Sequence, residues 1–164
     1  MTEGVRDSPP RNPFLSMALF RLDEQRYALP LAAVERVLPM VAVSPLPQTP
    51  AIALGVINVH GTVIPVLDFR RRVNLPSREI GISGHLLIAR TARRTVGLPV
   101  DEVLGAMEVD AQTVTGPQTV LPGIGQVTGI ATLADGLLFI YDLDAFLSLE
   151  EELQLADALQ ETGG

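Results

Sequence analysis

The 164-residue sequence contains no lysine, no cysteine and no tryptophan, and its twelve basic residues are all arginines. Without lysine, the chain cannot carry the phosphate-binding lysine of a P-loop or a protein kinase, and it cannot form a lysine Schiff base. Without cysteine, it has no thiolate nucleophile, no disulfide and no thiolate ligand for zinc or an iron–sulfur cluster. With only His60 and His85, a metal centre of three imidazoles is excluded as well.

Aromatic residues are also scarce, at 4% of a chain whose hydrophobic content is 47%. The sequence therefore predicts an aliphatic core of Val, Leu, Ile and Ala, residues that favour strands when they alternate or form short runs. A chain of this length buries roughly 70% of its unfolded surface as one domain or as two small, closely packed ones.

The formal net charge is −7 and the pI is about 4.7, a balance that disfavours binding to nucleic acid. Two long uncharged stretches, residues 37–67 and 111–134, are interrupted by proline and glycine, so neither is expected to span a bilayer. No basic region followed by an apolar stretch opens the chain, as a secretory signal would require. We expect a cytoplasmic protein without direct membrane insertion.

Short β-branched and alternating segments predict a mainly β fold. The expected strands are residues 16–22, 26–29, 34–38, 55–58, 62–69, 85–89, 95–98, 103–109, 127–132 and 137–141. Gly61 occupies the turn position that needs an unusual φ, and Pro65 suggests an edge strand or a bulge. A loop is expected over residues 113–126, disordered or loose tails over 1–13 and 161–164, and a helix over 149–159 that a Ser148/Glu151 capping box opens.

The two halves of the chain resemble each other. Residues 29–34 match residues 98–103 in Leu, Pro and Val at an offset of 69 positions, and the glycine-led segments 55–57 and 129–131 precede similar hairpins. The glycine-led segments are 74 positions apart, and the offset becomes 75 at the ends of the hairpins if Gly61 corresponds to Gly136. This order of hairpin, Leu-Pro corner, glycine and hairpin predicts two small β-barrels of similar build.

Candidate sites for chemistry each fail a requirement, so no catalytic, cofactor or metal residue is assigned. Residues 81–85 approach G-x-S-x-G, but no helix follows Ser83, and residues 123–129 lack the third glycine of a dinucleotide fingerprint. Asp142 and Asp144 are more typical of helix caps than of a cation site. The runs 70–72 and 150–152 are interpreted as a solvated turn and a solvated helix face.

Residues 55–69, G-V-I-N-V-H-G-T-V-I-P-V-L-D-F, resemble the CheW-like family signature G-V-x-N-L-R-G-x-x-x-P-V-x-D-L. Residues 96–103, V-G-L-P-V-D-E-V, resemble its V-G-L-x-V-D-x-V, and the closing hairpin is also similar. The resemblance implies one domain over residues 14–160, made of two intertwined five-stranded β-barrels and a C-terminal helix. The structural positions of the motif are Gly55, Asn58, Gly61, Pro65, Asp68, Gly97, Asp101 and Gly129.

The resemblance also implies a function. Proteins of this family are adaptors, not enzymes, and need no cofactor; they couple the cytoplasmic tips of methyl-accepting chemoreceptors to the regulatory domain of a CheA-type histidine kinase, in arrays at the membrane. A fused receiver module, as in CheV, is not expected, because the chain is short and contains no lysine. The alternative interpretation is a detached β-barrel module that binds another complex, unrelated to chemoreceptors.

The receptor-binding positions that the family implies are Val34, Arg36, His60 and Leu86, with Val56 adding apolar contact. Two of them depart from the family pattern, which usually has Glu at position 36 and Arg at position 60. An arginine and a histidine cannot form the ion pair that Glu and Arg make there. We therefore expect this adaptor to serve a divergent receptor or a separate chemosensory pathway, such as one that governs surface motility.

Overall fold

The structure is a computed structural model that describes residues 14–73, 75, 76, 78, 81, 83–115 and 127–163. The predicted tail over residues 1–13 and most of the predicted loop over 113–126 lie outside the described residues. At the other end, the last helix runs to Gly163, so the segment after residue 160 is helical up to that glycine.

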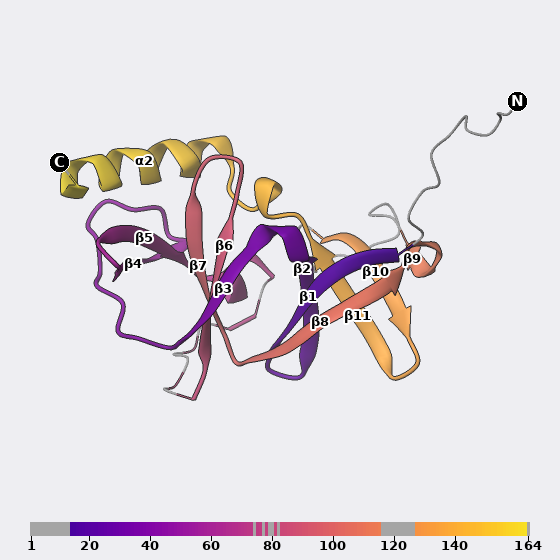
Figure 1. Cartoon of the computed structure of the whole chain (residues 1–164). Coiled ribbons are helices and arrows are strands. Elements are labelled where there is room, and N and C mark those ends of the chain that lie inside the picture. The colour runs from indigo at the N-terminus through magenta and orange to yellow at the C-terminus, as the bar shows by residue number, and fades with distance from the viewer. Residues whose placement is uncertain are drawn as a thin grey trace, which may run out of the picture.

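The described residues form two antiparallel-rich sheets, which lie side by side in Figure 1. The six-stranded sheet has the order β8-β1-β2-β11-β10-β9, and the five-stranded sheet has the order β3-β6-β7-β5-β4. The strands of the first are β1 Phe14–Leu22, β2 Gln25–Pro30, β8 Glu102–Asp110, β9 Val114–Thr115, β10 Val127–Leu133 and β11 Gly136–Tyr141. The strands of the second are β3 Val34–Pro39, β4 Ala53–Val59, β5 Thr62–Leu67, β6 His85–Arg90 and β7 Thr95–Val100.

Helical segments are short except at the C-terminus. They are η2 Leu31–Ala33, α1 Phe69–Arg72, η3 Ala111–Thr113, η5 Leu143–Ala145 and α2 Leu149–Gly163. Helix α2 lies along the five-stranded sheet (Figure 1). The predicted capping box opens it: the Glu151 N–H donates to Ser148 Oγ at 3.1 Å, and the Ser148 N–H donates to Glu151 Oε1 at 2.9 Å.

The strand registers confirm the internal repeat. Hairpins β1–β2 and β6–β7 have the same register 69 positions apart, since Ala18 pairs with Leu29 and Leu87 with Leu98. Hairpins β4–β5 and β10–β11 match 74 positions apart up to their last pairs, Val59 with Thr62 and Leu133 with Gly136. The predicted shift to 75 is therefore wrong, because Gly136 corresponds to Thr62 and not to Gly61.

The halves are intertwined, as predicted, because the first hairpin of each half lies between strands of the other half: β1–β2 lies between β8 and β11, and β6–β7 lies between β3 and β5. Strand β3 of the first half pairs with β6 of the second, and β8 of the second half pairs with β1 of the first. The strand counts are six and five instead of five and five. The difference is small: the two-residue strand β9 beside β10 corresponds to the single bridge between Ser44 and Val56 beside β4.

The sequence suggested that Pro65 lies on an edge strand or at a bulge. It does not lie on an edge strand, because β5 lies between β7 and β4. The parallel ladder between β5 and β7 consists of one registered pair, Val66 with Gly97, so proline interrupts no continuous ladder there. The register shift of the hairpin is on β4, between Ala53 and Gly55.

Three apolar cores hold the molecule together. Each sheet has an aliphatic core of its own, which includes Leu19 and Ile140 in the six-stranded sheet and Ile88 and Val66 in the five-stranded one. A central core lies between the sheets and takes residues from both, together with Leu155 of α2. Strands such as β1 and β6 contribute to two cores, which explains their near-continuous apolar runs.

The prediction of an aliphatic core is correct for the two sheet cores and incomplete for the central one, which combines aliphatic residues with a group of aromatic rings. Five of the seven aromatic residues are buried in the central core: Phe20, Tyr27, Phe69, Tyr141 and Phe146. The Phe69 ring is in contact with the other four, with centroid separations from 5.0 to 5.5 Å. Few aromatics are therefore enough, because they are concentrated where the two sheets meet.

Candidate partner-binding surface

The turn between β4 and β5 carries His60 at an exposed tip. His60 and Gly61 have φ of 51° and 87°, the two successive positive values of a type I′ hairpin turn. Asn58 Oδ1 accepts a hydrogen bond of 2.8 Å from the Gly61 N–H, which closes the turn. The sequence predicted the unusual φ at Gly61 and missed it at His60, a residue type that tolerates it less well.

Gly55 allows the chain to double back beside β4. The Ser44 N–H donates to the Val56 oxygen and the Val56 N–H donates to the Ser44 oxygen, both at 2.9 Å. Gly55 has a φ of 150°, and a Cβ at this position would lie 2.2 Å from the Ser44 oxygen. Gly129, its counterpart, is similarly tight, since a Cβ there would lie 2.7 Å from Val114 Cγ1.

Strand β3 places Val34 and Arg36 on opposite faces. Val34 pairs with Ala89 and Arg36 pairs with Ile88, its neighbour on β6, so Glu35 is the extra residue of a bulge. Val34 is partly buried against the central core, whereas Arg36 is exposed. Within the described part of the chain, Arg36 has no acidic partner.

Leu86 is not a surface residue. Its side chain is 0% exposed and belongs to the core of the five-stranded sheet, so it cannot contact a partner in this structure. Of the five predicted contact residues, Arg36 and His60 are exposed, Val34 and Val56 are half-buried, and Leu86 is buried. Of the other four residues, Val34 and Arg36 lie on β3, Val56 lies on β4 and His60 lies in the turn after β4. These two strands are the first and the last in the order of the five-stranded sheet.

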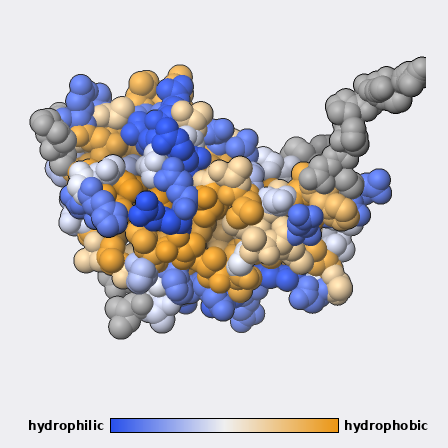
Figure 2. All heavy atoms as spheres, in the orientation of Figure 1, coloured by the Kyte–Doolittle hydropathy of each residue, from blue (hydrophilic) through white to orange (hydrophobic). Residues whose placement is uncertain are grey.

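Sequence reasoning missed the apolar side chains on the two edge strands. Val37 on β3 is 41% exposed, and Leu104 and Met107 on β8 are exposed to a similar degree. Figure 2 shows hydrophobic side chains gathered across the middle of this face, over β3 and the beginning of β8. Both strands occupy corresponding edge positions in the repeat, a relation that becomes visible only after the strands are paired.

The turn of α1 is only partly solvated, whereas the arginine run had suggested a solvated turn. Arg71 is exposed, but Arg70 forms an ion-paired link between the sheets. Arg70 is 3% exposed, and its Nη2 donates to Asp23 Oδ1 at 2.6 Å and to Asp101 Oδ2 at 3.1 Å. Asp101 also accepts from the Asp23 N–H at 2.6 Å and from Arg78 at 3.0 Å. The hydrogen bond from Arg70 lowers the pKa of Asp23 below its ordinary value.

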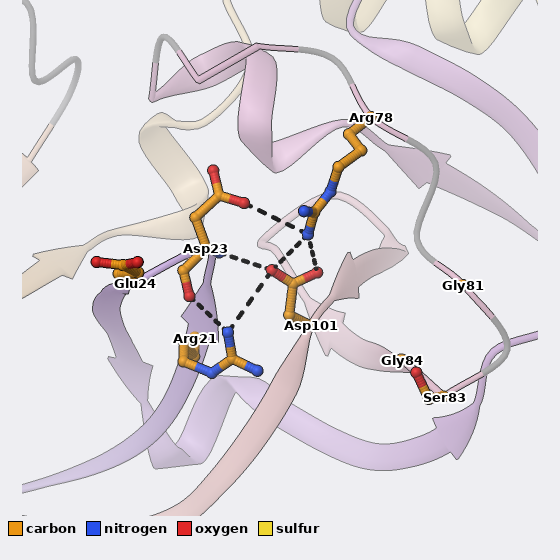
Figure 3. A pocket seen from close by; sticks show the side chains of 8 residues that line it. All are labelled: Arg21, Asp23, Glu24, Arg78, Gly81, Ser83, Gly84 and Asp101. Carbon is orange, nitrogen blue, oxygen red and sulfur yellow. Dashed lines mark hydrogen bonds and ion pairs between the residues drawn. The ribbon is translucent and has the colours of Figure 1, made fainter.

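An open cleft of about 680 Å³ lies beside this network (Figure 3). Four of its charged lining residues point toward one another, and Glu24 points away from them. Arg78 reaches Asp23 at 3.3 Å and Asp101 at 3.0 Å, and Arg21 donates to the Asp23 carbonyl oxygen. Because these charges are paired, the arrangement joins the β1–β2 turn to α1 and to the β7–β8 corner. It leaves no free cation to hold an anionic ligand among the described lining residues.

The acidic run at the start of α2 is also engaged, contrary to the expected solvated face. Glu150 is exposed, but Arg72 Nη2 donates to Glu151 Oε1 at 2.6 Å, and Arg94 Nε donates to the buried Glu152 at 2.7 Å. Two of the three acids therefore attach the helix to α1 and to the β6–β7 hairpin.

The carboxylates considered for chemistry both accept backbone N–H groups: Asp142 caps η5, and Asp144 holds the β6–β7 turn. Asp142 accepts from the Asp144 N–H at 2.9 Å at the start of η5, and Asp144 accepts from the Ala92 N–H at 2.6 Å. No group of three or more His, Asp and Glu in the described residues could hold a metal ion. Ser83 is followed by β6 instead of a helix, while residues 123–126 lie outside the described residues. None of the helices described has the length and apolar composition needed to cross a membrane.

The chain is similar to known proteins over most of its length. The family model for the CheW-like domain matches residues 16–151, which include both sheets. The chemotaxis protein CheW of Rhizobium meliloti (strain 1021) is 26% identical over 134 residues, 80% of this chain and 86% of that protein. Protein FrzA of Myxococcus xanthus is 32% identical over 98 residues, 60% of this chain and 61% of that protein.

A solved structure is similar in fold. The scaffolding protein TtCheW from Thermoanaerobacter tengcongensis matches with a TM-score of 0.75 and 27% sequence identity, covering 84% of this chain and 95% of that one. The likeness therefore extends over both sheets and their exchanged strands, and is not limited to the motif at residues 55–69.

Proposed function

Because the chain belongs to the CheW-like family, we propose that it is an adaptor that couples chemoreceptors to a CheA-type histidine kinase in chemosensory signalling. The observation that carries this proposal is the extent of the family match, which covers both sheets of a protein whose fold matches a scaffolding protein. In this role the protein works in the cytoplasm and is recruited to receptor arrays at the membrane.

The proposal includes the absence of enzymatic activity and of a cofactor. It is supported by the use of charged side chains in the described residues. Asp142 caps η5, Asp144 holds the β6–β7 turn, Arg70 joins the sheets, and Arg94 holds α2. Groups that are already paired in this way serve the fold and are poorly placed for proton transfer or nucleophilic attack.

The receptor-binding face that we propose is centred on Arg36 and His60, with apolar contact from the exposed edge of β3. Arg36 is exposed and lacks an acidic partner in the described residues, so a receptor that binds here gains by offering a carboxylate. A receptor adapted to glutamate at this position would instead bring a cation toward Arg36. This is the physical basis for expecting a divergent receptor.

The burial of each side chain determines which substitution is a suitable test of this face. Val34 packs against the central core, so Val34→Asp would weaken folding as well as binding. Arg36→Glu changes only an exposed charge, so we expect it to leave the free energy of unfolding nearly unchanged and to lower affinity for the cognate receptor about tenfold. Arg93→Glu is the matched control, because Arg93 is also exposed and lies on the β6–β7 hairpin, away from β3.

The partners themselves are tested by affinity purification of the tagged chain from its own cells. The proposal predicts that a CheA-type kinase and a chemoreceptor are recovered with it, and that Arg36→Glu reduces the receptor but not the kinase. Recovery of another complex without either partner would favour the alternative, a detached protein-binding module.

A further inference from the structure

Helix α2 presents two leucines to the surroundings. Leu149 is 66% exposed and Leu153 is 59% exposed, more than any other large hydrophobic residue described. Four positions apart, they lie on one face of the helix, and the exposed Ala156 continues that face at the next turn. We call these three residues the leucine ridge. Figure 2 shows hydrophobic side chains that protrude over the first half of α2.

The ridge cannot turn inward, because contacts on the opposite face fix the rotation of the helix. Leu155 and Ala158 are buried there. The ion pairs of Glu151 with Arg72 and of Glu152 with Arg94 attach the first turn to the rest of the protein. The leucines are therefore held outward by the fold, and their exposure is not a consequence of fraying at the start of the helix.

Acidic side chains border the ridge. Glu150 and Asp157 are exposed, follow the ridge positions 149 and 156 by one residue, and have no cationic partner in the part of the chain that the structure describes. In a helix pair with apolar residues at a and d, these two acids take e positions, where charge selects the partner. A second copy of this chain would bring the same acids close together, so self-association is disfavoured.

We propose that the leucine ridge is a docking site for an amphipathic helix of a partner protein, with arginine or lysine beside its apolar stripe. The two leucines supply apolar contact, and Glu150 and Asp157 select the basic flank. This site lies on α2, apart from β3 and the β4–β5 turn, so it is a second contact of the adaptor and does not depend on the receptor-binding face being correctly assigned.

The test uses the full chain, isotope-labelled, and two synthetic helices of about three heptads with leucine at a and d. One peptide carries arginine at its e and g positions, and the other carries glutamate there. The arginine peptide is expected to shift the amide resonances of residues 149–157 and to bind about tenfold more tightly than its glutamate twin at low salt. The variant E150R/D157R is expected to reverse that preference.

Two double variants distinguish binding at the leucine ridge from nonspecific hydrophobic binding. L149S/L153S is expected to lose binding of the arginine peptide, whereas the control L54S/L137S, which removes exposed leucines elsewhere, keeps it. Equal binding of both peptides, absence of binding, or unchanged binding to L149S/L153S would overturn the proposal. So would a concentration-dependent dimer, seen by sedimentation, that L149S/L153S abolishes, because the occupant would then be a second copy.

Discussion

The β4–β5 and β10–β11 hairpins share one register, yet their tips and the segments that follow differ. The β10–β11 tip is tied back to the six-stranded sheet, since Arg26 Nη2 donates to Asp135 Oδ1 at 2.9 Å. At the β4–β5 tip, His60 is exposed and has no such bond in the described residues. The repeated frame thus leaves one tip free, and it is the tip that carries a predicted partner-binding residue.

The segments after the two hairpins diverge as well. Asp68 and Asp142 occupy corresponding positions and both cap the turn that follows. After Asp68, Phe69 enters the central core and three arginines follow it, two of which join the sheets and α2. After Asp142 it continues into residues such as Leu143 and Phe146 that fill the central core. Both cap positions therefore lead into the central core, and the first half adds the ion pairs of Arg70 and Arg72.

The largest expected effect is at Phe69, the ring that touches four other aromatic residues. We expect Phe69→Ala to lower the free energy of unfolding by about 4 kcal/mol, because it opens a cavity between the sheets. Leu143→Ala, at the corresponding position, is expected to cost about 3 kcal/mol. Urea unfolding followed by far-UV circular dichroism measures both, and a larger loss at Leu143 would contradict the central place given to Phe69.

The next largest effect is expected at Gly55, and it can be compared with the effect at Gly129, where a Cβ would also clash. Gly55→Ala would push a Cβ into a backbone oxygen at a positive φ, and we expect a loss of about 3 kcal/mol. Gly129→Ala meets the end of a valine side chain that can move, so a loss of about 1 kcal/mol is expected. Urea unfolding measures both losses of stability. Equal losses would mean that the backbone at Ser44 moves aside as easily as the Val114 side chain.

Removing the ionic link has a moderate effect that depends on pH. Arg70→Met leaves Asp23 and Asp101 facing each other, and because Asp23 is partly solvated we expect a loss of about 2 kcal/mol at pH 7. The folded-state pKa of Asp23 lies below its ordinary 3.8, so the pair stabilises the fold above about pH 4. This contribution disappears as the pH falls through the lowered pKa.

The difference in stability between the parent chain and Arg70→Met should therefore shrink when unfolding is measured from pH 6 down to pH 3. A difference that stays constant across this range would show that Arg70 acts through packing and not through its charge. Arg71→Met, which removes an exposed arginine of the same helix, is the control and should change little.

The smallest effects are expected at the caps. Asp68→Ala and Asp142→Ala each remove a side chain that accepts a backbone N–H, and each should cost about 1 kcal/mol. Thermal unfolding can compare them directly. The repeat predicts nearly equal losses; a much larger one at either position would show that the two caps are not equivalent.

Local chemistry explains what the sequence predicted well. The duplicated hairpins, the turn at Gly61 and the capping box at Ser148 depend on residues close together in the chain, and the structure confirms them. The family resemblance also predicted the exchange of strands between halves, which no local pattern reveals.

The errors concern long-range partners. Arg70 and Glu152 look like surface charges in a sequence, and they are buried because acids and bases from distant segments meet them. Leu86 shares its apolar character with surface contact residues, and only the pairing of β6 between β3 and β7 places it inside. Burial of an individual side chain is decided by the assembled sheets, which composition and spacing do not describe.

The central claim is that this chain connects a receptor to a kinase, and reconstitution tests it most directly. Phosphorylation of the co-purifying CheA-type kinase is measured with receptor-containing membranes, with and without the purified chain. The account predicts that the receptor controls the kinase only when the chain is present, and that Arg36→Glu weakens this control. Receptor control of equal size without the chain would contradict it.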